Sequence, residues 1–203
     1  MGINLSKGQN INLSKTVSEE TLSNLRAAIG WDINKFSNGV KFDLDISIFA
    51  LEANGNGYKL VDVKDFCFYN CEQYTGSNVA ANGALTYSGD NRTGAGEGDD
   101  EFIDIDLSKT RNGIVNYSII VSISDPDGKG LNFGMVSNCY VRIINKSTDE
   151  EICKYDLAEE FSTETAVQVG SIYFYNNEWK FKAIGSGYTA GLDAFINEYQ
   201  FEG

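Results

Sequence analysis

The segment Ile114–Ser124, which reads IVNYSIIVSIS, decides the fold class. Every second residue from Val115 to Ile123 is apolar, and most of the residues between them are asparagine or serine. Successive side chains of a strand point to opposite faces, so this alternation predicts a β-strand with one face toward a core.

Similar patterns recur on both sides of this segment, separated by Gly, Asn and Asp. The other predicted strands cover residues 25–31, 42–48, 65–70, 102–107, 139–145, 151–156, 167–175 and 178–184. A short repeat, Ile3–Lys7 and Ile11–Lys15, predicts a β-hairpin around Gly8. About ten short strands joined by tight turns are typical of a two-sheet β-sandwich. The sequence therefore predicts a mostly β fold.

One helix is predicted near the C-terminus. Leu192, Phe195, Ile196 and Tyr199 have the spacing of one helical face, and Thr189 lies near the expected start. We expect this helix to cover one end of the sandwich, among a few short helices. No linker or larger repeat divides the 203 residues, so a single domain over residues 1–203 is expected.

Composition excludes several classes of function. The net charge of −13 argues against nucleic-acid binding, and no apolar run is long enough for direct membrane insertion. The absence of histidine excludes Ser-His-Asp and Cys-His catalysis and His-ligated metals. The four cysteines, without zinc-site spacing, are expected to be buried thiols. A secretory signal is not apparent, so the cytoplasm is the expected compartment.

Two aspartates on one predicted strand suggest a metal site. Leu44 and Ile46 would face the core, which places Asp43 and Asp45 together on the opposite face. Two carboxylates about 5 Å apart repel by roughly 3 kcal/mol at an effective dielectric constant of 20. A cation would remove this repulsion, and Lys41 alone does not neutralise the set.

A second acidic stretch runs from Asp90 to Glu101. Between Asp90 and Asp106 the chain has seven carboxylates and a single cation, Arg92. Alternating glycines free backbone carbonyls for ligation, and calcium prefers six to eight oxygen ligands in flexible geometry. The segment does not match an EF-hand, because Arg92 and Ala95 occupy a ligand position and the turn-glycine position.

Charge balance favours more than one ion. Six carboxylates give a combined charge of −6, which two divalent ions balance better than one: Asp43, Asp45, Asp90, Asp99, Asp100 and Glu101. An acidic surface loop without an ion is the alternative.

The order of motifs along nearly the whole chain resembles the TerD family of tellurium-resistance and stress proteins. The acidic glycine-rich signature is the most specific part. The matching motifs are Gly30–Asp32, Phe42–Asp45, Phe68–Asn70, Gly89–Gly94, Gly98–Glu101, Asn132–Gly134, Val136–Asn138, Tyr155–Leu157, Phe161–Ala166, Trp179–Phe181 and Gly185–Gly191.

This resemblance implies a β-sandwich with two adjacent calcium sites and no known catalytic chemistry. The implied ligands are Asp43, Asp45, Asn70, Asp90, Asn91, Asp99, Asp100 and Glu101, with backbone carbonyls near Gly94, Gly96 and Gly98. Asp32 is as well explained by capping a turn. Cys71 departs from the second asparagine common in relatives, which implies a weaker second site.

Three functions remain open from the sequence. The first is a calcium-binding stress-response protein whose acidic loops dock other stress-resistance proteins, in an assembly associated with the membrane. The second is a metal-dependent phosphoester hydrolase in which Arg92 stabilises negative charge. The third is a calcium-dependent module that binds a small ligand.

Overall fold

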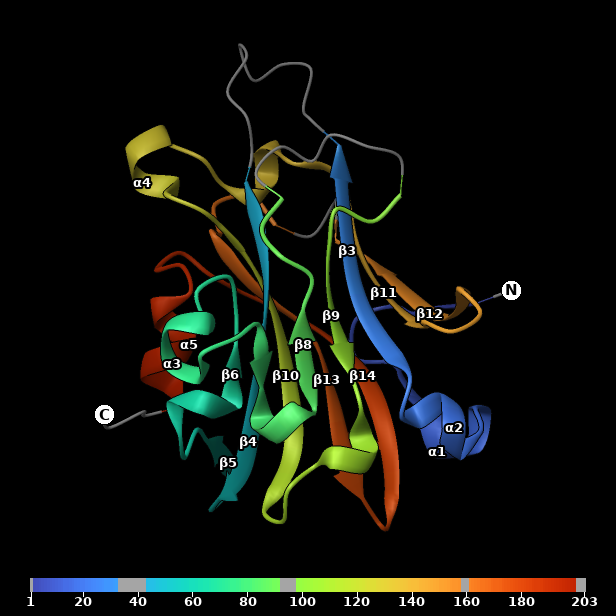
Figure 1. Cartoon of the computed structure of the whole chain (residues 1–203). Helices are drawn as coiled ribbons and strands as arrows, with labels where there is room; N and C mark the ends of the chain where they lie inside the picture. The colour runs from blue at the N-terminus through green and yellow to red at the C-terminus, as the bar shows by residue number, and fades with distance from the viewer. Residues whose placement is uncertain (1, 33–42, 92–97, 158–160, 200–203) are drawn as a thin grey trace.

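Two β-sheets packed face to face make up the protein (Figure 1). The computed structural model describes residues 2–32, 43–91, 98–157 and 161–199, without the side chains of Asp127 and Lys129. Within these residues each sheet has seven strands. The predicted two-sheet, mostly β fold is therefore confirmed.

The first sheet is antiparallel except at one edge, where its first two strands are parallel. Its order is β1 (Ile3–Asn4), β12 (Glu150–Asp156), β11 (Ser137–Asn145), β3 (Leu25–Asp32), β9 (Glu101–Ile105), β8 (Leu85–Tyr87) and β7 (Val79–Ala80).

The second sheet is antiparallel throughout. Its order is β2 (Asn10–Asn12), β14 (Glu178–Tyr188), β13 (Ala166–Tyr175), β10 (Ile114–Ile123), β4 (Leu44–Asn54) and β5 (Gly57–Lys59), and β6 (Phe66–Cys67) also pairs with β4.

Short helices connect the strands. The α-helices are α1 (Leu13–Thr16), α2 (Glu19–Leu22), α3 (Glu72–Thr75), α4 (Pro126–Lys129) and α5 (Asp193–Glu198). The 3-10 turns are η1 (Val63–Asp65), η2 (Ala81–Gly83), η3 (Leu107–Lys109) and η4 (Phe133–Met135). No helix among the described residues is long and apolar enough to cross a membrane.

Strands β4 and β10 are buried on both faces. On the core face Ile46 lies opposite Val121 and Ile48 opposite Ile119, all fully buried. On the other face Phe49 and Ser118 are fully buried as well. The prediction of one apolar and one polar face is correct for residue type, but the polar face is covered too.

The predicted C-terminal helix is confirmed as α5, but it does not cap an end of the sandwich. It lies on the outer face of the second sheet, where the hydroxyl groups of Tyr199 and Ser118 are 2.9 Å apart. The Tyr199 ring also packs edge-on against Phe49, with centroids 5.1 Å apart. Its apolar stripe therefore covers the second face of β4 and β10.

The predicted N-terminal hairpin is wrong. Strand β1 pairs with β12 in the first sheet, whereas β2 pairs with β14 in the second. The second copy of the repeat then turns helical, because the Asn12 side chain accepts a hydrogen bond from the Lys15 N–H (3.2 Å) and caps α1. Pairing with a different sheet covers two sheet edges, whereas an isolated hairpin is only marginally stable.

The predicted strand over residues 65–70 shortens to β6. Its aromatic residues stack instead of extending the ladder, with Phe66 centred 4.0 Å from Phe49 and 4.2 Å from Phe68. Cys71 then directly precedes α3, at its N-cap position. All four cysteines are buried and free, as predicted.

Candidate metal centre

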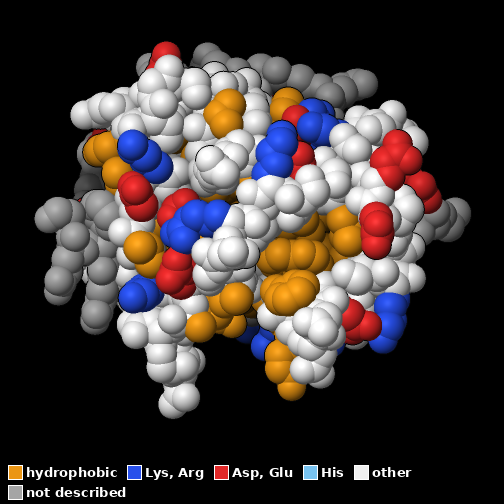
Figure 2. All heavy atoms as spheres, turned by 60° about the horizontal axis from the view of Figure 1, so that its bottom comes forward, with side chains coloured by type: hydrophobic (Ala, Val, Ile, Leu, Met, Phe, Trp, Pro, Cys, Tyr) orange, Lys and Arg blue, Asp and Glu red, His pale blue; other side chains and the backbone are white. Residues whose placement is uncertain are grey.

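Three carboxylates meet at the end of the molecule that points up in Figure 1. Asp43, Asp45 and Asp90 each contribute one oxygen to a group whose members all lie within 4.8 Å of one another. We call these three residues the carboxylate cluster. The opposite end, turned toward the viewer in Figure 2, carries side chains of both charges around exposed hydrophobic ones.

The first two aspartates are positioned by the pairing of β4 with β10. Asp45 lies opposite Ser122, and the Ser124 N–H donates a hydrogen bond to the Asp43 carbonyl (2.8 Å). Between them Leu44 is fully buried in the core. The prediction that Asp43 and Asp45 share the face opposite Leu44 is therefore correct.

Asp90 reaches the cluster from the other sheet, just after β8. On one side of it the Ser88 N–H donates to the Phe102 carbonyl (3.0 Å). On the other side the Asn91 N–H donates to Glu101 Oε1 (2.9 Å). These two bonds attach the Asp90 segment to β9, so the cluster joins the first sheet to the second.

Glu101 is fully buried and accepts hydrogen bonds from three groups of the described residues. Oε1 accepts from the Tyr87 hydroxyl (2.9 Å) and the Asn91 N–H (2.9 Å), and Oε2 accepts from the Ile46 N–H (3.1 Å). Burial raises the pKa of this carboxyl to about 7, although its three donors lower it. Glu101 therefore ties β4, β8 and β9 together.

Asp99 takes part in an ion pair with β11. Its two carboxylate oxygens accept from Arg142 Nε and Nη2, both at 2.8 Å, and the Tyr140 hydroxyl donates to Oδ1 (3.0 Å). This pairing raises the pKa of the Arg142 guanidinium. One of the six negative charges in the predicted balance is thus matched by an arginine.

Asp100 forms hydrogen bonds to Asn91 and to β3. Asp100 Oδ2 accepts from the Trp31 N–H (3.1 Å), and the Asn91 amide donates to the Asp100 carbonyl (3.2 Å). Burial raises the pKa of Asp100, and the negative charges of Asp99 and Asp32 act in the same direction. Asp32 itself accepts from the Asn138 amide (2.5 Å) at the end of β3.

The remaining predicted ligands divide into three cases. The Asn70 amide donates to Gln73 Oε1 (2.8 Å) in the turn before α3, while Cys71 is buried. Gly98 has φ +101°, a left-handed conformation that favours glycine. Gly94 and Gly96 lie outside the described residues, as does Arg92 of the hydrolase hypothesis.

The donor set of the cluster fits calcium. Two oxygens on opposite sides of a calcium ion, each bound at 2.3–2.6 Å, lie about 4.6–5.2 Å apart. Three oxygens that all lie within 4.8 Å of one another are close enough for small shifts of the side chains to place them around one such ion. Magnesium demands a stricter octahedron and keeps more of its water, so it suits such an all-carboxylate group less well.

Sequence reasoning missed the partners that hold the acidic segment. Tyr87 and Arg142 lie 14 and 43 residues from the carboxylates that they bind. No local spacing signals such contacts. The only available hint was the excess of carboxylates itself, since a folded chain must supply donors or cations for those it buries.

The chain is similar to stress and resistance proteins. A family model described as the TerD domain matches residues 1–199. General stress protein 16U of Bacillus subtilis is 47% identical, covering 98% of this chain and 97% of the relative. Tellurium resistance protein TerD of Alcaligenes sp is 40% identical over the same shares.

A solved structure supports the fold. A homologue of telluride resistance protein TerD from Streptomyces coelicolor A3(2) superposes with a TM-score of 0.67 at 20% identity, covering 84% of this chain and 93% of that one. Together with the match over residues 1–199, these likenesses establish that the chain belongs to the TerD family.

Proposed function

We propose that this member of a stress-resistance family is a calcium-binding protein whose ion is held by Asp43, Asp45 and Asp90. The observation that carries the proposal is the convergence of these three carboxylates within 4.8 Å. Calcium would cancel their mutual repulsion. Because Asp43 directly precedes β4, Asp45 lies within it, and Asp90 follows a strand of the other sheet, a bound ion would also link the two sheets.

The number of ions stays a prediction. Asp100 and Asp32 lie near each other, which supports a second acidic position beside the cluster. The ion pair of Asp99 with Arg142 argues against Asp99 as a ligand of either ion. The proposed set is therefore the cluster for one ion, and Asp100 with its neighbours for a second, weaker one.

Thermal unfolding tests the proposal. A ligand that binds only the folded state at a hundred times its Kd adds about 2.7 kcal/mol to the free energy of unfolding. We expect calcium to raise Tm clearly above the value in chelator, and magnesium to raise it less. Equal midpoints in calcium and chelator would rule the proposal out.

We further propose that the calcium-loaded acidic end docks other stress-resistance proteins. Relatives carry the names tellurium resistance protein and chemical-damaging agent resistance protein. Ordering of the acidic segments by calcium would present one fixed charged surface to such a partner. Affinity purification from the native host should recover the same partner in calcium and lose it in chelator and for Asp45→Asn. Partner recovery that ignores calcium would contradict this docking role.

A further inference from the structure

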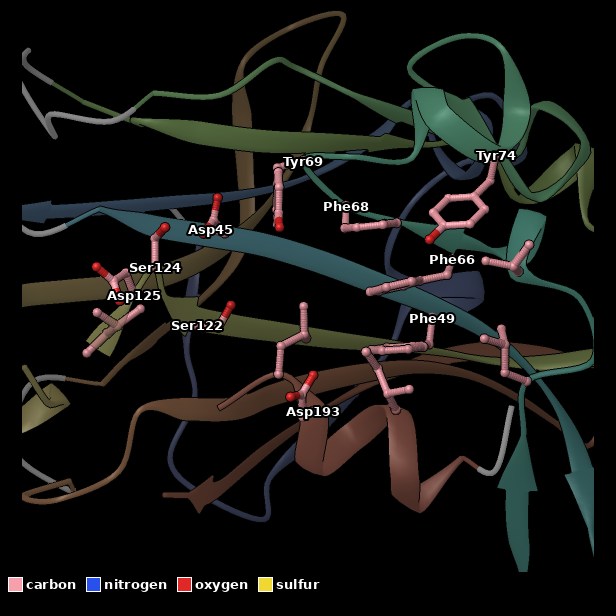
Figure 3. A pocket seen from close by; sticks show the side chains of 15 residues that line it. Asp45, Phe49, Phe66, Phe68, Tyr69, Tyr74, Ser122, Ser124, Asp125 and Asp193 are labelled. Atoms are coloured by element: carbon pink, nitrogen blue, oxygen red, sulfur yellow. The ribbon is translucent and has the colours of Figure 1, made fainter. Parts of the chain in front are cut away.

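A pocket of about 400 Å³ opens on the outer face of the second sheet. Strands β4 and β10 form its floor, the β6–α3 segment one side and α5 the other (Figure 3). Pockets of this size commonly hold small organic molecules. It lies beside the carboxylate cluster, with which it shares only Asp45.

One wall of the pocket is aromatic. Phe68, Phe66 and Phe49 form a stacked column, with neighbouring ring centroids 4.2 Å and 4.0 Å apart. Tyr69 and Tyr74, exposed by 55% and 43%, stand at the upper end of this column (Figure 3). Because the stacked phenylalanines cover one another and are almost fully buried, the two tyrosines supply most of the accessible aromatic surface.

The other wall is acidic and polar. Asp45, Asp125 and Asp193 line it, together with the hydroxyl groups of Ser122 and Ser124. Figure 3 shows these side chains on the side away from the phenylalanine column, with Asp193 at the start of α5. None of the described residues that line the pocket is a lysine or an arginine.

We propose that this pocket binds a small organic cation, with its apolar part against the aromatic wall and its ammonium or guanidinium group facing Asp125 and Asp193. The positive charge complements the acidic wall, and the apolar part packs on the aromatic side chains. The two features lie at opposite sides of one pocket, which selects a molecule that is apolar at one end and positive at the other. The two carboxylates that face the cationic group, Asp125 and Asp193, lie outside the cluster, so the test can be carried out without calcium.

Three indoles of nearly equal shape provide the test. Tryptamine is a cation, tryptophol is neutral and indole-3-propionate is an anion. Each is titrated into the ¹⁵N-labelled full chain in buffer that contains a chelator, and amide shifts are followed. We expect saturable shifts in β4, β6 and α5 with tryptamine binding most tightly, tryptophol more weakly and indole-3-propionate weakest. Equal affinities for the three, or no saturable shift with tryptamine, would overturn the proposal.

Variants separate the two walls. Asp193→Asn should weaken tryptamine binding about fivefold, as expected for one exposed charge pair, and leave tryptophol binding unchanged. Tyr69→Ala should weaken the binding of both compounds. Glu20→Gln is the matched control, since it also removes a carboxylate from the first turn of a short helix, and it should change neither affinity. A loss of tryptamine affinity in Glu20→Gln as large as in Asp193→Asn would contradict specific recognition.

Discussion

Two aspartates of one acidic segment have opposite surroundings. Asp99 lies against Arg142 and Tyr140 of β11 and forms two hydrogen bonds to the guanidinium. Asp90 lies against two further carboxylates, Asp43 and Asp45. The contrast teaches that acidic composition alone does not locate a metal site. A carboxylate that faces an arginine stabilises the fold, whereas carboxylates that converge on one another favour a cation.

Glu101 is a buried acid of the same segment that binds three donors, and its removal should have the largest effect on stability. Glu101→Ala leaves the Tyr87 hydroxyl and the N–H groups of Ile46 and Asn91 without their acceptor in the core. We expect the free energy of unfolding in urea to fall by about 4 kcal/mol, because each buried unpaired donor costs about 1–3 kcal/mol.

Glu101→Gln is the matched control, since the amide keeps one acceptor oxygen. It should lose about half as much stability. If Glu101→Ala were as stable as the wild type, the assignment of Glu101 as the tie between β4, β8 and β9 would be wrong.

The stabilisation by calcium should differ between variants of Asp90 and of Asp99. Asp90→Asn removes a proposed ligand, so we expect it to lose most of the calcium-induced rise in Tm. In the wild type that rise corresponds to about 2.7 kcal/mol in the free energy of unfolding at a hundred times the Kd. Asp99→Asn should begin from a lower Tm in chelator and still show the full rise with calcium. The reverse pattern would exchange the roles that we assign to the two residues.

Removal of the guanidinium should destabilise the protein by a smaller amount. Arg142→Ala leaves Asp99, whose side chain is 13% exposed, without its cation, and we expect a loss of about 2 kcal/mol. Lys15→Ala is the control, because Lys15 is 70% exposed in its pair with Glu178 and its removal should cost much less stability. Equal losses in urea unfolding would show that the Asp99 pair is an ordinary surface contact.

The smallest expected effect is a pH dependence at Glu164, a third acid that is satisfied by donors. The backbone N–H groups of Thr163 and Ser162 lower the pKa of its carboxyl. Its stabilising contribution is therefore present above the unfolded pKa of about 4.3 and is lost as the pH falls through the lower folded value. Glu164→Gln should flatten the acid side of the Tm profile, and an unchanged profile would contradict this role.

Strand positions were largely predictable from the sequence. Alternation located β10, β13 and β14, and the parity of Asp43 and Asp45 placed both on one face, because a period of two is a local property of the backbone. The pairing of the two INLSK copies with different sheets was not predictable. That choice depends on which sheet edges the rest of the fold leaves open.

Which acidic residues bind donors of the protein, and which converge on one another, could not be predicted either. Arg142 reaches Asp99 from a strand 43 residues away, and Tyr87 reaches Glu101 across a sheet pairing. Both contacts depend on strand order, which the sequence pattern does not specify. The acidic segment stays a predicted cation site, and several of its predicted ligands also hold the segment to the sheets.

Calorimetric titration of calcium into chelator-treated protein tests the central claim most directly. We predict saturable binding by the wild type with at least one site, and loss of the tightest site in Asp45→Asn. Asp99→Asn should retain that site. An absence of calcium binding by the wild type, or a titration of Asp45→Asn that matches it, would contradict the assignment of the carboxylate cluster as a calcium centre.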